Sequence, residues 1–101
     1  MMMQTTLWFT QGTAISSVDW QDFIDNEVTP RFKQGIAIYD AQRVWPDNSG
    51  RWVKANSKAL VLIHGVEIAD NTHIEELRDI YKKRFAQASV MRVDAPACVG
   101  Y

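Results

Sequence analysis

The sequence predicts an α+β fold of the ferredoxin-like type: a four-stranded antiparallel sheet with two helices on one face and an extended hairpin between the second and third strands. The first observation is the order of apolar periodicities, which runs strand, helix, strand, strand, helix, strand along 101 residues. The second is that a split βαβ unit of this order closes into a sandwich. The third is that right-handed crossovers place both helices on one face, with strand order 4-1-3-2. A chain of this length forms one domain, residues 1–101.

The first strand and the first helix are separated by a short loop. Residues 5–10 alternate, with Leu7 and Phe9 on one side and Trp8 on the other. Residues 11–14, which include a glycine, are expected to form a turn or loop. Ser16 or Ser17 is placed to cap a helix. Its apolar stripe contains Trp20, Phe23, Ile24 and Val28. The residue before a proline avoids the helical region, so Pro30 should end this helix near Val28.

The middle of the chain predicts one long hairpin. Residues 35–45 and 58–66 have strand character, and residues 46–50 carry the strongest turn signal of the sequence. Residues 51–53 return from that turn, so the tip from Trp45 to Trp52 should extend past the sheet. The continuous apolar run within 58–66 indicates a central strand that is covered on both faces.

The second helix is expected to begin at residues 70–71, because Thr72 and Glu75 have the spacing of a capping box. Its stripe recurs at steps of three and four and consists of Ile74, Leu77, Ile80, Tyr81 and Phe85. Cations at 82–84 favour the negative end of the helix dipole. A strand over 89–93 follows, and regular pairing is expected to end at residues 94–96, which include a proline.

The predicted sheet has one face that no helix covers. Trp8 and Tyr39 belong to that face. Because an apolar face of this size usually marks a partner or ligand surface, we expect a homodimer or a higher homo-oligomer.

Composition excludes several classes of protein. A net charge of −1 with interspersed acids and bases creates no field that would attract DNA or an anionic membrane. The single cysteine, Cys98, excludes an internal disulfide and a thiolate zinc site. No stretch is long and apolar enough for a membrane span. The first residues lack the features of a signal peptide, so the chain as given is expected to be cytoplasmic, or exported if a leader has been removed.

Aromatic and arginine residues are the candidate ligand-binding groups. The guanidinium of Arg31 suits a carboxylate or phosphate, and an anionic ligand is favoured if Arg31 and Arg84 converge. Trp45 and Trp52 are expected to pair across the hairpin, with an aromatic platform as the alternative. The predicted ligand-binding residues are Trp8, Arg31, Tyr39, Trp45, Trp52, His64, Arg84 and Arg92.

No motif supplies catalysis. His64 and His73 do not have metal-ligand spacing, and no dinucleotide or P-loop signature is present. Ser57, Ser89 and Cys98 have no adjacent base in the sequence. We therefore predict no catalytic residue, no metal and no cofactor. Binding of RNA by the aromatic and basic hairpin is disfavoured because the RNP aromatic motif is missing.

Several short sequence motifs are shared with a known family. They are residues 27–32 (EVTPRF), 35–36, 50–51, 57–58, 81–85 (YKKRF), 87–90 (QASV) and 94–98 (DAPAC), with Trp45 between them. In these motifs the chain resembles a bacterial family of small domains known only as a domain of unknown function. The resemblance runs from about Phe9 to Tyr101 and implies a bacterial or phage source. Many family members resemble exported or lipid-anchored proteins. The resemblance implies no activity, so no catalytic residue follows from it.

The functional hypothesis is a non-catalytic, oligomeric domain that binds and sequesters a small ligand, anionic or nucleotide-like in its sharpest form. Its pocket is expected on the open sheet face or beneath the hairpin. One alternative is a protein-interaction or structural module that uses the tryptophans. Another is a cofactor-free enzyme of the dimeric α/β-barrel type, in which His64, Tyr39 or Asp40 would transfer protons.

Overall fold

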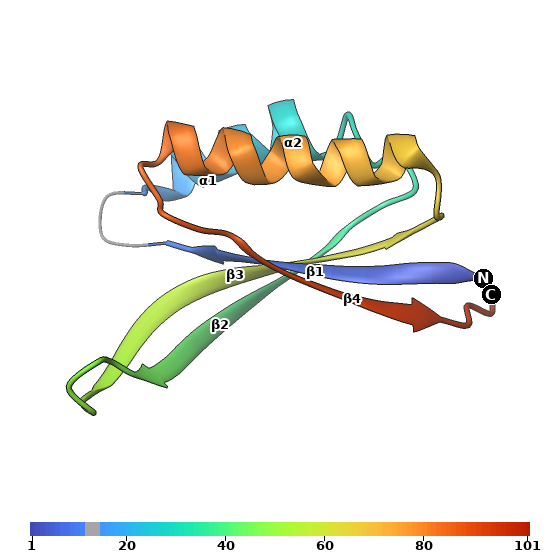
Figure 1. Cartoon of the computed structure of the whole chain (residues 1–101). Coiled ribbons are helices and arrows are strands. Elements are labelled where there is room, and N and C mark those ends of the chain that lie inside the picture. The colour runs from blue at the N-terminus through green and yellow to red at the C-terminus, as the bar shows by residue number, and fades with distance from the viewer. Residues whose placement is uncertain (12–14) are drawn as a thin grey trace.

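The computed structural model describes residues 1–11 and 15–101 and shows two helical segments above one four-stranded sheet (Figure 1). The predicted loop at 11–14 falls largely on residues 12–14, which lie outside the described residues. The elements are β1 (Met2–Thr10), α1 (Ser17–Phe23), a π-helical turn η1 (Ile24–Val28), β2 (Ala37–Pro46), β3 (Trp52–His64), α2 (Ile68–Arg84) and β4 (Met91–Ala97). The strand order β2-β3-β1-β4, antiparallel throughout, confirms the ferredoxin-like α+β fold and the predicted 4-1-3-2 order.

The strand register decides which side chains meet the helices. Leu7 lies opposite Leu60 and Arg92, and Trp8 lies opposite Ala59 and Met91. Because neighbouring residues of a strand point to opposite faces, Leu7 and Phe9 face the helices and Trp8 faces away. Tyr39 also pairs with Ala59 and therefore shares the face of Trp8, as predicted.

An aromatic cluster joins the sheet to both helices. The ring centroid of Phe9 lies 4.6 Å from that of Tyr81 and 5.6 Å from those of Trp20 and Phe23. Edge-to-face contacts of this kind add to the free energy gained by burying apolar area. Both predicted stripes contribute to the core, although Ile80 and Phe85 of the second stripe are only partly buried against it. The buried core residues are Leu7, Phe9, Trp20, Phe23, Ile24, Val28, Phe32, Leu60, Leu62, Ile74, Leu77, Tyr81 and Val90.

The first helical segment begins and ends as predicted, but its second part is a π-helical turn. The Ser16 hydroxyl accepts a hydrogen bond from the Asp19 backbone N–H at 3.0 Å, so Ser16 is the cap. After Phe23 the helix widens into the π turn, in which the Thr29 N–H donates to the Ile24 carbonyl. The helical segment ends at Val28, two residues before Pro30.

The second helix begins earlier than predicted. Its cap is Glu67, and the Asp70 carboxylate accepts from the backbone N–H of Glu67 at 3.3 Å. Thr72 therefore lies inside the helix, and the predicted Thr72–Glu75 capping box is wrong. The apolar stripe of α2 could not indicate this first turn, because Ile68 in that turn is exposed and does not belong to the buried stripe. The cations at 82–84 occupy the last turn as predicted.

Two strand predictions are corrected. β4 continues through Pro96 to Ala97, whereas pairing was expected to end near Asp94. A proline is tolerated there because β4 is an edge strand and needs no donor on its outer side. β3 is central, as predicted, but within one chain the helices cover only one of its faces (Figure 1). Val61 and Ile63 on the other face are half-buried.

Replacement of Tyr81 by phenylalanine should destabilise the protein by about 1–2 kcal/mol, because the buried Tyr81 hydroxyl donates to the Thr10 carbonyl at 2.6 Å. Urea unfolding measures this loss. Tyr39→Phe removes the same hydroxyl from the exposed face and should change the free energy of unfolding by less than about 0.5 kcal/mol. Equal effects of the two substitutions would contradict the assigned role of Tyr81.

Candidate functional site

A hollow lies at one end of the sandwich, and we call it the end pocket. It is formed where the α1–β2 connection, the end of β3 and the first turns of α2 meet. Its volume of about 590 Å³ is within the range of small-molecule sites. The residues that line it are Met2, Pro30, Arg31, Phe32, Lys33, Gln34, Gly35, Ile63, His64, Gly65, Asp70 and His73.

The wall from the α1–β2 connection follows from local turn chemistry. Pro30 prevents the helix from continuing, and the Gly35 N–H donates to the Phe32 carbonyl at 3.1 Å. Gly35 has φ of 111°, a backbone conformation that glycine adopts without strain. Phe32 reaches into the core, as predicted, and its ring lies edge-on to the ring of His73, with centroids 6.2 Å apart. The pocket thus has aromatic walls from two separate elements.

The two arginines of the anion hypothesis do converge, but on a carboxylate of the protein itself. Arg31 Nη1 lies 3.5 Å from Glu27 Oε1, and Arg84 Nη2 lies 3.0 Å from Glu27 Oε2. Arg31 also reaches Glu76 at 3.2 Å. Glu27 therefore occupies the position that an anionic ligand was expected to take. Arg31 lines the end pocket, whereas Arg84 lines a different hollow near Phe85.

His64 is held between β1 and the start of the next loop. Its Nε2 lies 2.6 Å from the Thr5 hydroxyl, and its Nδ1 donates to the Gly65 carbonyl at 2.7 Å. The residue is 6% exposed. Because both ring nitrogens have partners within the protein, His64 positions the pocket wall and leaves neither nitrogen for a bound molecule.

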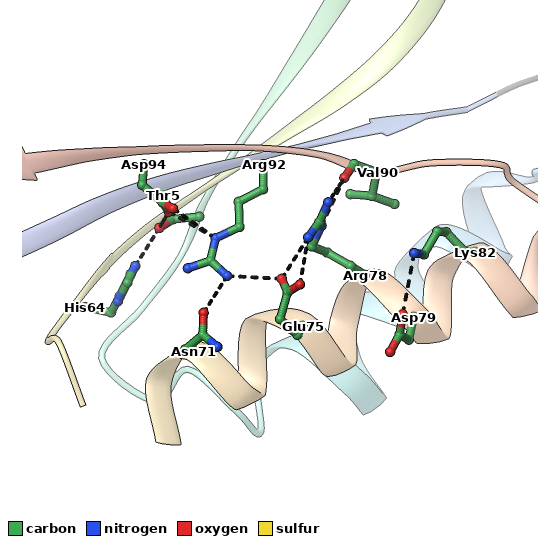
Figure 2. A network of polar contacts seen from close by, with 10 residues as sticks. All are labelled: Thr5, His64, Asn71, Glu75, Arg78, Asp79, Lys82, Val90, Arg92 and Asp94. Atoms are coloured by element: carbon green, nitrogen blue, oxygen red, sulfur yellow. Dashed lines mark hydrogen bonds and ion pairs between the residues drawn. The ribbon is translucent and has the colours of Figure 1, made fainter. Parts of the chain in front are cut away.

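A series of hydrogen bonds and ion pairs runs from His64 across β4 to α2 (Figure 2). The Thr5 hydroxyl donates to Asp94, and Arg92 Nε donates to the same carboxylate at 3.1 Å. Arg92 Nη1 donates to Glu75 at 3.0 Å and to the side chain of Asn71 at 2.8 Å. Further along, Arg78 joins Glu75 to the Val90 carbonyl. We call this set the Arg92 network.

The network lowers the pKa values of its two carboxyl groups. Burial of Asp94 opposes its charge, but the hydrogen bonds from Thr5 and Arg92 and the positive charge of Arg92 outweigh burial, so the pKa of Asp94 is lowered. Glu75 follows the same pattern: burial raises its pKa, and Arg78 and Arg92 lower it by more. Both groups are therefore held as carboxylates.

A second, smaller hollow lies on the other side of His64, and we call it the polar pocket. Its volume is about 200 Å³. Its lining residues are Met3, His64, Gly65, Val66, Glu67, Asn71, Arg92 and Asp94. The two pockets share His64 and Gly65 as a common wall.

The structure places the predicted aromatic residues elsewhere. Trp8 and Tyr39 lie on the open sheet face, and neither lines the end pocket. The predicted pairing of Trp45 with Trp52 is wrong, because Trp45 lies opposite Val53 and Trp52 lies opposite Pro46, which puts the two rings on opposite faces of the hairpin. The guanidinium of Arg43 instead lies over the Trp45 ring, 5.4 Å from its centroid.

His73, Asp70 and Lys33 line the end pocket but were not among the sequence candidates. His73 was interpreted as a solvated helix residue, Asp70 as a helix start and Lys33 as part of a connection. The stop signal at Pro30, which directs the chain toward α2, is the one sequence feature that indicates this end of the fold.

Among residues 1–11 and 15–101, no cluster of three or more histidine, cysteine, aspartate or glutamate side chains is arranged to hold a metal ion. Across the same residues, no helix has the length and hydropathy needed to cross a membrane.

Comparison with known proteins identifies the family. A family model described as a protein of unknown function (DUF3574) matches residues 4–101, so the chain belongs to this family, which confirms the resemblance seen in the sequence. No curated protein matches the chain significantly.

Two solved structures share the fold. A phage SAM lyase in complex with S-methyl-5'-thioadenosine superposes with a TM-score of 0.68 at 16% identity, over 93% of this chain and 80% of the other. The phage SAM lyase in its apo state gives a TM-score of 0.65 at 16% identity, over 92% and 78% of the two chains. At this identity the likeness establishes the fold and no activity.

Acid should weaken the protein through Asp94 and Glu75. Their pKa values are lower in the folded chain than in the unfolded chain. Their stabilising contribution is complete above the unfolded values, near about 4, and is lost as the pH falls through the lower folded values. Urea unfolding at roughly pH 6 and roughly pH 3 measures the difference.

The double variant Glu75→Gln, Asp94→Asn should lose less stability on acidification than the unchanged protein. Asp25→Asn, an exposed change outside the network, is the control. An acid-induced loss of the same size in the double variant would contradict the role assigned to these carboxylates.

Proposed function

We propose that this DUF3574 domain binds a small nucleoside-like ligand in the end pocket. The observation that carries the proposal is the combination of groups in one hollow of suitable volume: two aromatic rings, a carboxylate and a flexible cation.

Each of these groups matches one part of a nucleoside. The edges of Phe32 and His73 offer an apolar wall for a flat base. The Asp70 carboxylate can accept hydrogen bonds from the two hydroxyls of a ribose. Lys33 is exposed at the rim and supplies a cation for an attached anionic group. Arg31 closes the same rim while paired with Glu27 and Glu76, so it supports the wall and leaves the ligand's charge to Lys33.

The solved neighbour supports the ligand class. The phage SAM lyase that shares this fold holds S-methyl-5'-thioadenosine, which is a modified nucleoside. The superposition spans nearly the whole of this chain, so the hollow at the end of the sandwich belongs to a fold that accommodates such a molecule in another protein.

We propose in addition that the domain forms a homo-oligomer through the open sheet face. Tyr39 is 59% exposed and Val93 is 48% exposed on this face, with Met91 and Trp8 beside them. Burial of these side chains against a second copy would remove apolar area from water.

The enzyme alternative has less support. His64 has partners on both ring nitrogens, Tyr39 lies exposed on the open face, and Asp40 forms an ion pair with Lys58. These three candidate proton-transfer groups line no common hollow within the described residues. Binding is therefore the function that the geometry favours.

Calorimetric titration with S-methyl-5'-thioadenosine and with adenosine tests the binding proposal. His73→Ala and Asp70→Asn should each weaken binding by about tenfold, which corresponds to about 1.4 kcal/mol. Asp79→Asn makes the same change of charge further along α2, outside the pocket, and should leave binding unchanged.

Trp52→Ala separates the end pocket from the hairpin platform. Trp52 is 70% exposed at the hairpin tip and should have no effect on binding. If Trp52→Ala weakens binding while His73→Ala does not, the ligand lies on the hairpin and the end pocket is the wrong site. Absence of binding for both nucleosides at about 1 mM would contradict the proposal as a whole.

Sedimentation velocity tests the oligomer. The unchanged protein should sediment as a dimer or larger species, and Val93→Glu should shift it to the monomer because a charge on the open face cannot be buried without a partner. Val18→Glu places the same charge on the exposed side of α1 and is the control. A monomer in the unchanged protein at high concentration would overturn this proposal.

A further inference from the structure

We infer that the polar pocket is a subsite for an α-amino carboxylate group, so that the full ligand is a nucleoside that carries an amino-acid tail. The inference rests on the proposed function and deepens it by assigning the second hollow. It starts from the charged side chains that line that hollow.

The polar pocket presents both signs of charge within a small volume. Arg92 is cationic, and Asp94 and Glu67 are anionic. An α-amino carboxylate has the complementary pair, a carboxylate for the guanidinium and an ammonium for the acidic side chains. The lowered pKa of Asp94 means that this carboxyl is present as the acceptor that an ammonium requires.

The guanidinium of Arg92 has capacity left for a ligand. Its Nε donates to Asp94, and its Nη1 donates to Asn71 and Glu75. Its Nη2 makes no hydrogen bond to any residue in 1–11 or 15–101, as Figure 2 shows for the residues drawn. The Arg92 side chain is only 17% exposed. Among the described residues no unpartnered side-chain nitrogen or oxygen is buried, so Nη2 is open to solvent. Its two N–H groups can therefore donate to an additional anionic acceptor.

The carboxylates of the polar pocket can accept further hydrogen bonds as well. Asp94 Oδ1 accepts from Thr5 and Arg92, whereas Oδ2 accepts from Arg92 Nε at 3.2 Å and from no other of the described residues. The Glu67 side chain is exposed at the mouth of the pocket. The carboxylates of Asp94 and Glu67 both line this hollow, so they offer acceptors to an ammonium group.

The position of the polar pocket connects it to the nucleoside site. His64 and Gly65 form the wall that both pockets share. Gly65 has no side chain, and a Cβ built there would lie 3.2 Å from the Asp70 carboxylate. At Gly65 the two pockets are therefore separated by backbone atoms alone. A ligand with its base in the end pocket can direct a short chain past this wall.

Two thioether nucleosides that differ in their tail test the subsite. S-Methyl-5'-thioadenosine has no amino-acid tail, and S-adenosylhomocysteine has one. Calorimetric titration of the unchanged protein should show at least about tenfold tighter binding of the second compound. A third compound, the same nucleoside with a tail that has the amine but lacks the carboxylate, should lose most of that gain.

Variants assign the gain to residues. Arg92→Gln should bring the affinity for S-adenosylhomocysteine close to that for S-methyl-5'-thioadenosine and leave the latter unchanged. Arg78→Gln removes the other guanidinium of the Arg92 network, does not line the polar pocket, and should preserve the tenfold difference. It therefore controls for damage to the network.

The outcomes separate the two proposals. If both nucleosides bind with equal affinity, or if the compound without the carboxylate binds as tightly as S-adenosylhomocysteine, the subsite is wrong and the nucleoside site stands. If neither nucleoside binds, the proposed function is wrong and the subsite falls with it. The comparison of the three compounds uses the unchanged protein, so it decides the matter even if Arg92→Gln does not fold.

Discussion

The packing of two helices against one face of the sheet is the constraint on which the rest of this structure depends. Phe9 on β1 and Tyr81 on α2 lie at the centre of that contact, and the rings of Trp20 and Phe23 bring α1 into it. Since the helices are shorter than the longest strands, they cannot cover the whole sheet. The hairpin of β2 and β3 extends beyond them, the second face stays open, and hollows form where the helical cover stops (Figure 1).

The charged residues mostly satisfy one another. Glu27 accepts from Arg31 and Arg84, and Glu75 accepts from Arg78 and Arg92. Each carboxylate thus joins a helix to an element distant in the chain, and a count of arginines overestimates the positive charge offered to a ligand. A guanidinium becomes relevant to binding when one of its nitrogens has no partner in a hollow. Arg92 Nη2 has none among the described residues, and Arg92 lines the polar pocket.

The proposed site and the fold are connected through a few backbone features. Pro30 ends the first helical segment, and the following turn carries Phe32 into the core and Lys33 to the rim. Gly65 follows the last residue of β3 and allows Asp70 to approach the backbone. These positions are what bring an aromatic wall and a carboxylate together. A phage SAM lyase in complex with S-methyl-5'-thioadenosine shares this fold.

The sequence by itself determined the order of the elements, the fold class, the two apolar stripes, the cap at Ser16 and the family. These properties depend on periodicity and on neighbours within a few residues, which a sequence displays directly. Only the tertiary structure decided where α2 begins, that Trp45 and Trp52 lie on opposite faces, and which carboxylate each arginine contacts. Those outcomes depend on strand register and on partners far apart in the chain, such as Thr5 with Asp94 or Arg84 with Glu27. A one-residue change of register would move every side chain of a strand to the opposite face of the sheet, and residue spacing alone does not specify the register.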